Sequence, residues 1–247
     1  MTLENSGKVA VVIGVGQSQG LGAAIARRSA REGLHTFVAG RTQGRLESIV
    51  KEIEAEGGTA TAVATDTTVA ADVERLFDRA VDEGGSLDFV AYNAGNAQMG
   101  PIAETDDEAF EAVWRVCCFG GFLVGRAAAR RMVDQGSGSI LFTGATASLR
   151  ARPPFTTFAS AKAALRALSQ GLAREFGPKG IHVGHIVVDG MIDGDQINSR
   201  MPALKERMGE SGMLNIDAIA DAFWTLHTQH PSAWTWELDL RPYKEDW

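Results

Sequence analysis

The chain has 247 residues, of which 45% are hydrophobic and 22% are charged. This length suffices for one large domain with a substantial core. Its 24 lysine and arginine residues stand against 31 aspartate and glutamate residues, giving a net charge of −7. This acidic balance argues against a nucleic-acid partner, and no apolar run approaches the roughly 18 residues of a membrane span. We therefore expect a cytoplasmic protein, since the first residues also lack the basic and apolar segments of a signal peptide.

Seven short apolar segments are expected to form strands, and six longer segments with helical periodicity separate them. Most of the strand segments are apolar on both faces, as the strands of a covered parallel sheet must be. The alternation indicates βαβ units, so the sequence predicts an α/β fold with a doubly wound parallel sheet of about seven strands and helices on both faces. The expected strands occupy 8–14, 35–40, 59–66, 87–95, 138–144, 180–190 and 232–240, and the expected helices occupy 20–33, 43–56, 69–83, 104–134, 156–177 and 216–229.

No break in composition divides the chain, so we expect a single domain over residues 1–247. One long irregular connection, near residues 190–215, is apolar and rich in methionine. Connections of that length are often binding loops or lids, and methionine suits an adaptable hydrophobic ligand. We expect this segment to be a lid over the substrate; packing on a core of its own is the alternative.

A glycine-rich stretch, "GVGQSQGLG" at residues 14–22, directly follows the first strand and opens the first helix. Its glycines form a GxGxxxGxG pattern, with Gln19 where the dinucleotide fingerprint GxGxxG has its third glycine. Glycines permit a tight turn and let the backbone approach a pyrophosphate, which then lies at the helix N-terminus. The stretch therefore predicts a nucleotide-binding loop, although an ordinary structural turn is the alternative.

The second strand ends with Gly40 and then Arg41, at the place where an acid would hydrogen-bond the ribose hydroxyls of NAD. An arginine there accommodates the 2′-phosphate of NADP, and Arg45 follows one turn further along. We therefore predict NADP(H) as the cofactor, against the alternative of a solvated arginine. Asp66, at the end of the third strand, is expected to cap the next segment and to hold the adenine amine.

With these residues placed, the chain resembles the short-chain dehydrogenase/reductase family over nearly its full length. The resemblance implies a Rossmann-like fold, a nicotinamide cofactor, hydride transfer to or from a small-molecule substrate, and a homodimer or homotetramer. The motifs that carry it are Gly16-x-x-x-Gly20-x-Gly22, Asp66, "NAG" at Asn93–Gly95, "GSI" at Gly138–Ile140, "ASAK" ending at Lys162 and "GPKGIHV" at Gly177–Val183. The residues expected to bind the cofactor are Gly14, Gly16, Ser18, Gln19, Gly20, Leu21, Arg41, Asp66, Thr67, Asn93, Ala94, Gly95, Lys162 and Ile192.

The chain departs from the family pattern at the catalytic positions. The active-site tyrosine of the family aligns with Phe158, and its serine aligns with Ala145, one residue before Thr146. Its asparagine aligns with Cys117, and the proline of its proline–glycine turn aligns with Asp189. Of the usual catalytic set only the lysine, Lys162, remains. The sequence thus resembles a divergent branch of the family that lacks the active-site tyrosine.

The family mechanism uses the lysine to hold the nicotinamide ribose and to lower the tyrosine pKa, while the tyrosine protonates the alkoxide and the serine polarises the carbonyl. A phenyl ring donates no proton, and the loss of a positioned general acid costs about 10²–10⁴ in rate. The candidate catalytic residues are therefore Lys162, Thr146, Phe158 lining the pocket, and Asp189.

Three explanations of this atypical set stay open. The acid comes from elsewhere: Thr146, Asp189, a water held by Lys162, or one of the two tyrosines, Tyr92 and Tyr243. Alternatively, the substrate needs no strong acid, as with an iminium ion or a conjugated alkene. In the third explanation the protein binds NADP(H) without turning it over and serves as a sensor or scaffold.

The remaining polar residues carry weaker signals. Arg150 and Arg152 are interpreted as solvated side chains, with the selection of an anionic substrate as the alternative. His182 and His185 are expected to face opposite sides of the sheet because they are an odd number of residues apart on one strand. Together with His227 and His230 they form no metal-binding pattern, so we expect no metal site.

Overall fold

The computed structural model describes residues 7–245, and its centre is a seven-stranded sheet in which every pairing is parallel. The strand order is β3-β2-β1-β4-β5-β6-β9, so the direction of winding reverses between β1 and β4. This confirms the predicted Rossmann-like, doubly wound α/β fold. The strands of this sheet are β1 (Lys8–Ile13), β2 (His35–Gly40), β3 (Ala60–Ala64), β4 (Ser86–Tyr92), β5 (Gly138–Thr143), β6 (Ile181–Val188) and β9 (Glu237–Leu240).

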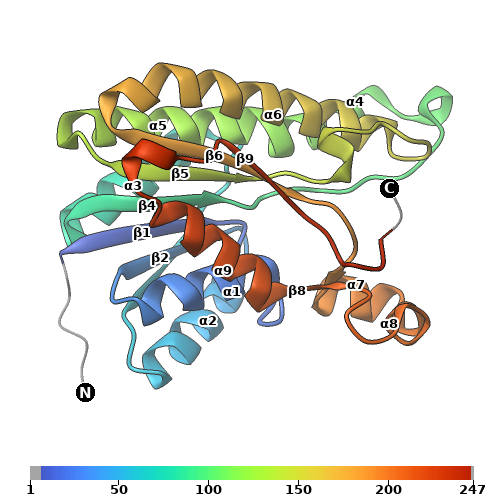
Figure 1. Cartoon of the computed structure of the whole chain (residues 1–247), viewed down its shortest axis with the longest axis horizontal. Coiled ribbons are helices and arrows are strands. Elements are labelled where there is room, and N and C mark those ends of the chain that lie inside the picture. The colour runs from blue at the N-terminus through green and yellow to red at the C-terminus, as the bar shows by residue number, and fades with distance from the viewer. Residues whose placement is uncertain (1–6, 246–247) are drawn as a thin grey trace.

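Helices cover both faces of the sheet, as Figure 1 shows. One layer packs its apolar stripe against one core cluster, and the other layer packs against a second cluster on the opposite face. The central strands supply alternate side chains to both clusters, which explains why their sequence is apolar throughout. The first layer contains α1 (Leu21–Arg31), α2 (Gln43–Ala55) and α9 (Ile216–His227); the second contains α3 (Ala70–Gly84), α4 (Asp107–Trp114), α5 (Gly120–Gln135) and α6 (Thr156–Phe176).

The expected helix over 104–134 is interrupted by one turn of π-helix, Arg115–Phe119, between α4 and α5. Among the described residues, the stretch Asp107–Gln135 is the one helix with the length and composition of a membrane span, with a mean hydropathy of 1.3. Its most apolar window is 61% buried inside the fold, as the core helix of a globular domain is. Figure 1 shows α5 lying along the sheet in this layer.

The connection predicted to be irregular near 190–215 contains regular structure. Two short helices, α7 (Asp195–Arg200) and α8 (Pro202–Met208), lie between the strands β7 (Ile192–Asp193) and β8 (Leu214–Asn215), which pair with each other in parallel. Elements of two to seven residues are too short to show a hydrophobic period, so no sequence pattern predicts them. In Figure 1 this segment lies beyond one end of the sheet, beside the layer that contains α1 and α9.

Candidate active site

The glycine loop between β1 and α1 lies at the carboxyl end of the sheet, beside the point where the winding reverses. Gly14 has φ of +87°, and a Cβ there would lie 2.5 Å from the backbone nitrogen of Ala94. A Cβ on Gly22 would lie 2.5 Å from the carbonyl oxygen of Gly14. Gly16 differs, because beyond its two chain neighbours no atom lies within 4 Å of the position of its Cβ. The packing of the protein thus accounts for Gly14 and Gly22, whereas Gly16 leaves open space in which a ligand can approach the backbone.

The N-terminus of α1 opens from the same loop. Its N-cap residue is Gly20, no side chain caps it, and its first turn contains no acid. The first N–H groups of a helix lack partners within the helix, and together with the dipole they bind anions. The predicted residues Gly16, Gly20 and Leu21 therefore form a site whose chemistry fits a pyrophosphate.

The polar side chains of the loop are held by the protein itself. The hydroxyl of Ser18 donates to the Glu52 carboxylate over 2.9 Å, and the Arg27 guanidinium donates to both that carboxylate and the carbonyl oxygen of Ser18, each over 3.0 Å. The backbone nitrogen of Gln19 donates to the carboxylate of Asp195 over 3.1 Å. Sequence reasoning placed Ser18 and Gln19 against the cofactor and missed these three partners, which lie on α1, α2 and α7.

The residues predicted on the adenosine side lie at the ends of β2 and β3. Arg41 is exposed just after β2, and Arg45 is exposed in the first turn of α2. Asp66 accepts hydrogen bonds on one oxygen from the backbone nitrogen and the hydroxyl of Thr68, over 2.9 and 2.8 Å. Asp66 thus closes the turn before α3 but does not cap the helix, whose N-cap is Val69 with no side-chain hydrogen bond. Thr67 is buried beneath this turn.

Lys162, on α6, is buried to 4% exposure beside the loop after β4. Its Nζ donates to the carbonyl oxygen of Thr143 over 2.8 Å, and a Cβ on Gly95 would lie 3.5 Å from the same Nζ. Burial lowers the pKa of this ammonium, an effect that the nearby Cys117 partly opposes. An ammonium has three donors, and within residues 7–245 only this one hydrogen bond is made. The remaining donors suit ribose hydroxyls.

Asn93 fixes the backbone around this position. Its amide nitrogen donates to the carbonyl oxygen of Gly14 over 3.4 Å, and its amide oxygen accepts from the Thr143 hydroxyl over 3.1 Å. Asn93 therefore links the loop after β1 to the ends of β4 and β5. Ala94, the next residue, meets the glycine loop at Gly14.

Phe158 lies one helical turn before Lys162, and its ring centroid is 5.7 Å from the lysine nitrogen. The ring is half-buried and packs against a small cluster of Val113, Cys117 and Ala161. Cys117 lies within the π-helical turn and is fully buried. The side of Lys162 that faces this cluster is therefore apolar.

Asp189 and Thr146 lie together after the adjacent strands β6 and β5, and they bind each other. The Thr146 hydroxyl donates to one Asp189 oxygen over 2.6 Å, and Arg150 and Arg241 donate to the other over 2.5 and 2.8 Å. Asp189 is fully buried. The interpretation of Arg150 as a solvated side chain is wrong, because it forms this ion pair with a carboxylate that sequence reasoning did not connect to it.

Comparison with known proteins decides the family. A family model described as short chain dehydrogenase matches residues 8–203. The chain belongs to this family. It is 30% identical to the oxidoreductase asL5 of Sarocladium schorii over 208 residues. The aligned region covers 84% of this chain and 78% of that protein.

Two crystal structures are similar to this short-chain dehydrogenase over almost their whole length. One, a short-chain dehydrogenase from Rhodopseudomonas palustris, is 38% identical, with a TM-score of 0.82 and coverage of 96% of this chain and 99% of that chain. The other, a metagenomic short-chain oxidoreductase in complex with NADP, is 25% identical, with a TM-score of 0.82 and coverage of 96% and 98%. The protein is therefore an oxidoreductase of the short-chain dehydrogenase family.

Neither tyrosine of this short-chain dehydrogenase is positioned as a replacement acid. The hydroxyl of Tyr92 donates to the carbonyl oxygen of Val116 in the π-helical turn, and the side chain is fully buried. Burial raises the pKa of Tyr92 far above its usual range. Tyr243 lies in the chain after β9 and is 79% exposed. Within one subunit, Tyr92 therefore has a structural role and Tyr243 is exposed to solvent.

The histidines of β6 face opposite sides of the sheet, as predicted. His182 stacks on Trp234, with ring centroids 4.8 Å apart. His185 is fully buried on the other face, where its Nδ1 is 3.0 Å from Glu237, which also binds Arg166. Burial lowers the pKa of His185 to about 4, although the Glu237 carboxylate opposes the change. No metal-binding group of three His, Cys, Asp or Glu side chains occurs between residues 7 and 245.

Ile192 is the last of the predicted cofactor residues. It lies in β7, where it is half-buried and packs on the core cluster of α1 and α9. Most of the predicted residues thus follow the carboxyl ends of β1, β2, β3, β4, β5 and β6. Phe158 and Lys162 lie on α6 and Ile192 lies in β7.

Proposed function

We propose that this short-chain dehydrogenase is an NADP(H)-dependent oxidoreductase with an atypical active site. It transfers a hydride to or from a small carbonyl or alcohol, an imine or an activated alkene, with Phe158 and Ala145 in place of the usual tyrosine and serine. The observation that carries this proposal is Lys162, which is buried with unused donors beside Phe158. A buried ammonium without enough acceptors is costly unless a ligand supplies them.

The preference for NADP(H) rests on Arg41. It is exposed at the end of β2, where a guanidinium can meet a 2′-phosphate, and no acid takes that position. The metagenomic relative in complex with NADP supports the same cofactor. NADP(H) would accept or supply the hydride. Gly16 and the N-terminus of α1 would hold its pyrophosphate, and Lys162 would hold its ribose.

The substrate class follows from the donors that remain. Phe158 has no proton to give, and Thr146 directs its hydroxyl to Asp189. A ketone, whose alkoxide needs a proton as it forms, is therefore a poor substrate. An iminium ion is better suited, because hydride transfer neutralises its positive charge. An activated alkene is also better suited, because its activating group delocalises the negative charge that hydride transfer creates.

A second candidate function is an NADP(H)-binding sensor or scaffold that does not turn the cofactor over. It is favoured by the engagement of both Thr146 and Asp189 in a buried network. The two functions differ in one outcome. Steady NADPH oxidation with any imine or alkene supports the enzyme, whereas tight binding with no turnover across a broad panel supports the sensor.

We further propose a cytoplasmic, single-domain protein that assembles as a homodimer or homotetramer and uses neither membrane nor nucleic acid. The large apolar side chains Phe110, Trp114 and Phe122 are 36–39% exposed and follow one another at intervals of four or eight residues on α4 and α5. Residues at such intervals share a helix face, and a second copy of the chain would cover this aromatic stripe.

The test of the proposed function is the Phe158→Tyr variant. A hydroxyl placed one turn from Lys162 should restore the missing acid and raise ketone reduction by about 10²-fold over the natural chain. NADPH oxidation with a panel of ketones, imines and activated alkenes measures this, and Phe158→Leu is the matched control. No gain in ketone reduction, with cofactor binding intact, would mean that the pocket is remodelled beyond the loss of one hydroxyl.

A further inference from the structure

The glycine loop and the segment 190–215, here called the lid segment, are joined by a reciprocal pair of hydrogen bonds. The Gln19 backbone nitrogen donates to the Asp195 carboxylate over 3.1 Å, and the Asp195 backbone nitrogen donates to the Gln19 carbonyl oxygen over 2.9 Å. The two residues are 176 positions apart in the chain. The backbone N–H and the carbonyl oxygen of Gln19 are thus both hydrogen-bonded to Asp195.

The backbone beside this pair is shaped for close contact. A Cβ on Gly194 would lie 2.6 Å from the Gln19 carbonyl oxygen, so any larger residue would force the lid segment away from the loop. The lid segment is also held together internally: the Asp193 carboxylate accepts from Asn198 and pairs with Lys205, each over 2.9 Å. Asp195 therefore connects two preformed units.

The charges on the two sides of the loop differ. Behind the loop, the Glu52 carboxylate that holds Ser18 is compensated by Arg27 over 3.0 Å. In front of the loop, the Asp195 carboxylate has no ion pair with a side chain in residues 7–245. It lies instead beside the uncapped, positive end of α1, which stabilises a nearby carboxylate. The hydrogen bond and the helix dipole hold Asp195 in place without a cation.

We propose that Asp195 is a clasp residue, which closes the lid segment onto the glycine loop and thereby retains a bound dinucleotide. The inference rests on the proposed function for the identity of the ligand only. The dinucleotide would lie between the glycine loop and the end of β6, from which the lid segment departs. Its release then requires the pair between Gln19 and Asp195 to open first, so the clasp controls the dissociation rate more than the association rate.

Two substitutions at one position separate the hydrogen bond from the charge. Asp195→Ala removes both, whereas the side-chain oxygen of Asp195→Asn still accepts from Gln19 but carries no charge. The clasp predicts that Asp195→Ala accelerates NADPH dissociation about ten-fold, while Asp195→Asn accelerates it less than about three-fold. Gly194→Ala, which pushes the segments apart, should resemble Asp195→Ala. Asp217→Asn, an exposed acid at the start of α9, is the charge-matched control.

The dissociation rate is measured by stopped-flow fluorescence, displacing NADPH from the full-length protein with excess NADP. Tighter binding in both Asp195→Ala and Asp195→Asn would overturn the proposal, because Asp195 would then be an anion that competes with the pyrophosphate. An unchanged dissociation rate in Asp195→Ala would overturn it as well.

A second readout needs no cofactor and separates this inference from the proposed function. Hydrogen exchange of the ligand-free protein should show a protected Gln19 amide in the natural chain and faster exchange of that amide in Asp195→Ala. Equal exchange in the two proteins would mean that the clasp does not form, whatever dinucleotide the protein binds. Protection together with a failure to bind any dinucleotide would reject the proposed function and leave the contact in place.

Discussion

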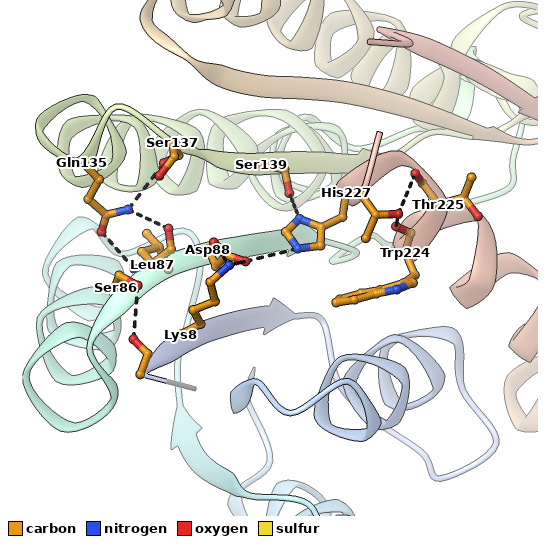
Figure 2. A network of polar contacts seen from close by, with 12 residues as sticks. Lys8, Ser86, Leu87, Asp88, Gln135, Ser137, Ser139, Trp224, Thr225 and His227 are labelled. Atoms are coloured by element: carbon orange, nitrogen blue, oxygen red, sulfur yellow. Dashed lines mark hydrogen bonds and ion pairs between the residues drawn. The ribbon is translucent and has the colours of Figure 1, made fainter. Parts of the chain in front are cut away.

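Polar side chains gather at both ends of the sheet, but they are used differently. At the amino ends of the strands, Asp88 binds Lys8 and His227, each over 3.3 Å, and His227 also reaches the Ser139 hydroxyl over 2.7 Å (Figure 2). Burial alone would raise the pKa of Asp88, but the hydrogen bond and charge of His227 and the charge of Lys8 hold it below its usual value. Each group in this network meets a partner from another element.

At the carboxyl ends of the strands, some hydrogen-bond donors have no partner among the described residues. Lys162 has donors that no described residue accepts, α1 has an uncapped N-terminus, and Gly16 faces open space. Buried polar groups in proteins are almost always satisfied, so the unused donors of Lys162, beside an uncapped helix N-terminus and open space, point to a ligand. Both ends of the sheet are polar, and they differ in whether their hydrogen-bond donors have partners within the protein.

The largest effect is expected from Lys162→Met. The variant removes the donor that would hold the ribose, so turnover of NADPH should fall by at least about 10²-fold in the assay that detects activity. Because folding lowers the pKa of Lys162, the ammonium costs stability in the folded state, and the melting temperature should not fall. The matched variant at the other end of the sheet, Lys8→Met, should keep its turnover. Equal losses in both would contradict the contrast between the two ends.

A smaller effect is expected from Arg41→Ala. Removing the guanidinium should weaken NADPH binding about ten-fold and leave NADH binding unchanged, because only the phosphorylated cofactor uses it. Fluorescence titration measures both affinities. Arg79→Ala, on the exposed face of α3, is the control. A parallel loss for both cofactors would place Arg41 in the structure of the loop instead.

The amino-end network should respond in stability alone. His227→Ala leaves Ser139 and Asp88 short of a partner, which costs about 1–3 kcal/mol. In a chain of this size that lowers the melting temperature by roughly 2–4 °C per kcal/mol. Calorimetry measures the loss. A change in NADPH affinity would show that the two ends are coupled, which this account does not expect.

The smallest effect concerns pH. His185 has a folded pKa of about 4 and an ordinary value of 6.5, so between these values the unfolded chain takes up a proton that the folded chain refuses. Stability should therefore fall as the pH is lowered from about 6.5 to 4. His185→Gln should lose less over this window, as judged by melting temperature, while the exposed His230→Gln should follow the natural chain. Identical profiles for all three proteins would refute the assignment.

The fold was predictable because its signals are local. Most strands of the main sheet are short apolar runs, β9 alternates apolar and charged residues, and the long helices carry a 3.6-residue period. The helices α7 and α8 were missed because six or seven residues show no reliable period. The π-helical turn at Arg115–Phe119 was missed as well, because one extra residue in a helical turn has no compositional signature.

The site residues were predictable only where they belong to a motif of recognisable spacing. Lys162 and the glycine loop could be located, whereas the partners of Asp189 could not. Arg241 lies 52 positions after Asp189, and nothing in either local sequence indicates the other. One signal was available: both residues follow strands that are parallel neighbours in the sheet, so their positions meet at the same edge. Predicting the pair requires the order of the strands, which the sequence alone does not state.

The most direct test of the central claim is calorimetric titration of the purified protein with NADPH, NADP, NADH and NAD side by side. The unused donors at the carboxyl end predict micromolar binding of NADP(H), with NAD(H) at least about ten-fold weaker because only NADP(H) engages Arg41. If none of the four binds, the open capacity around Gly16, α1 and Lys162 does not serve a dinucleotide, and the account is contradicted.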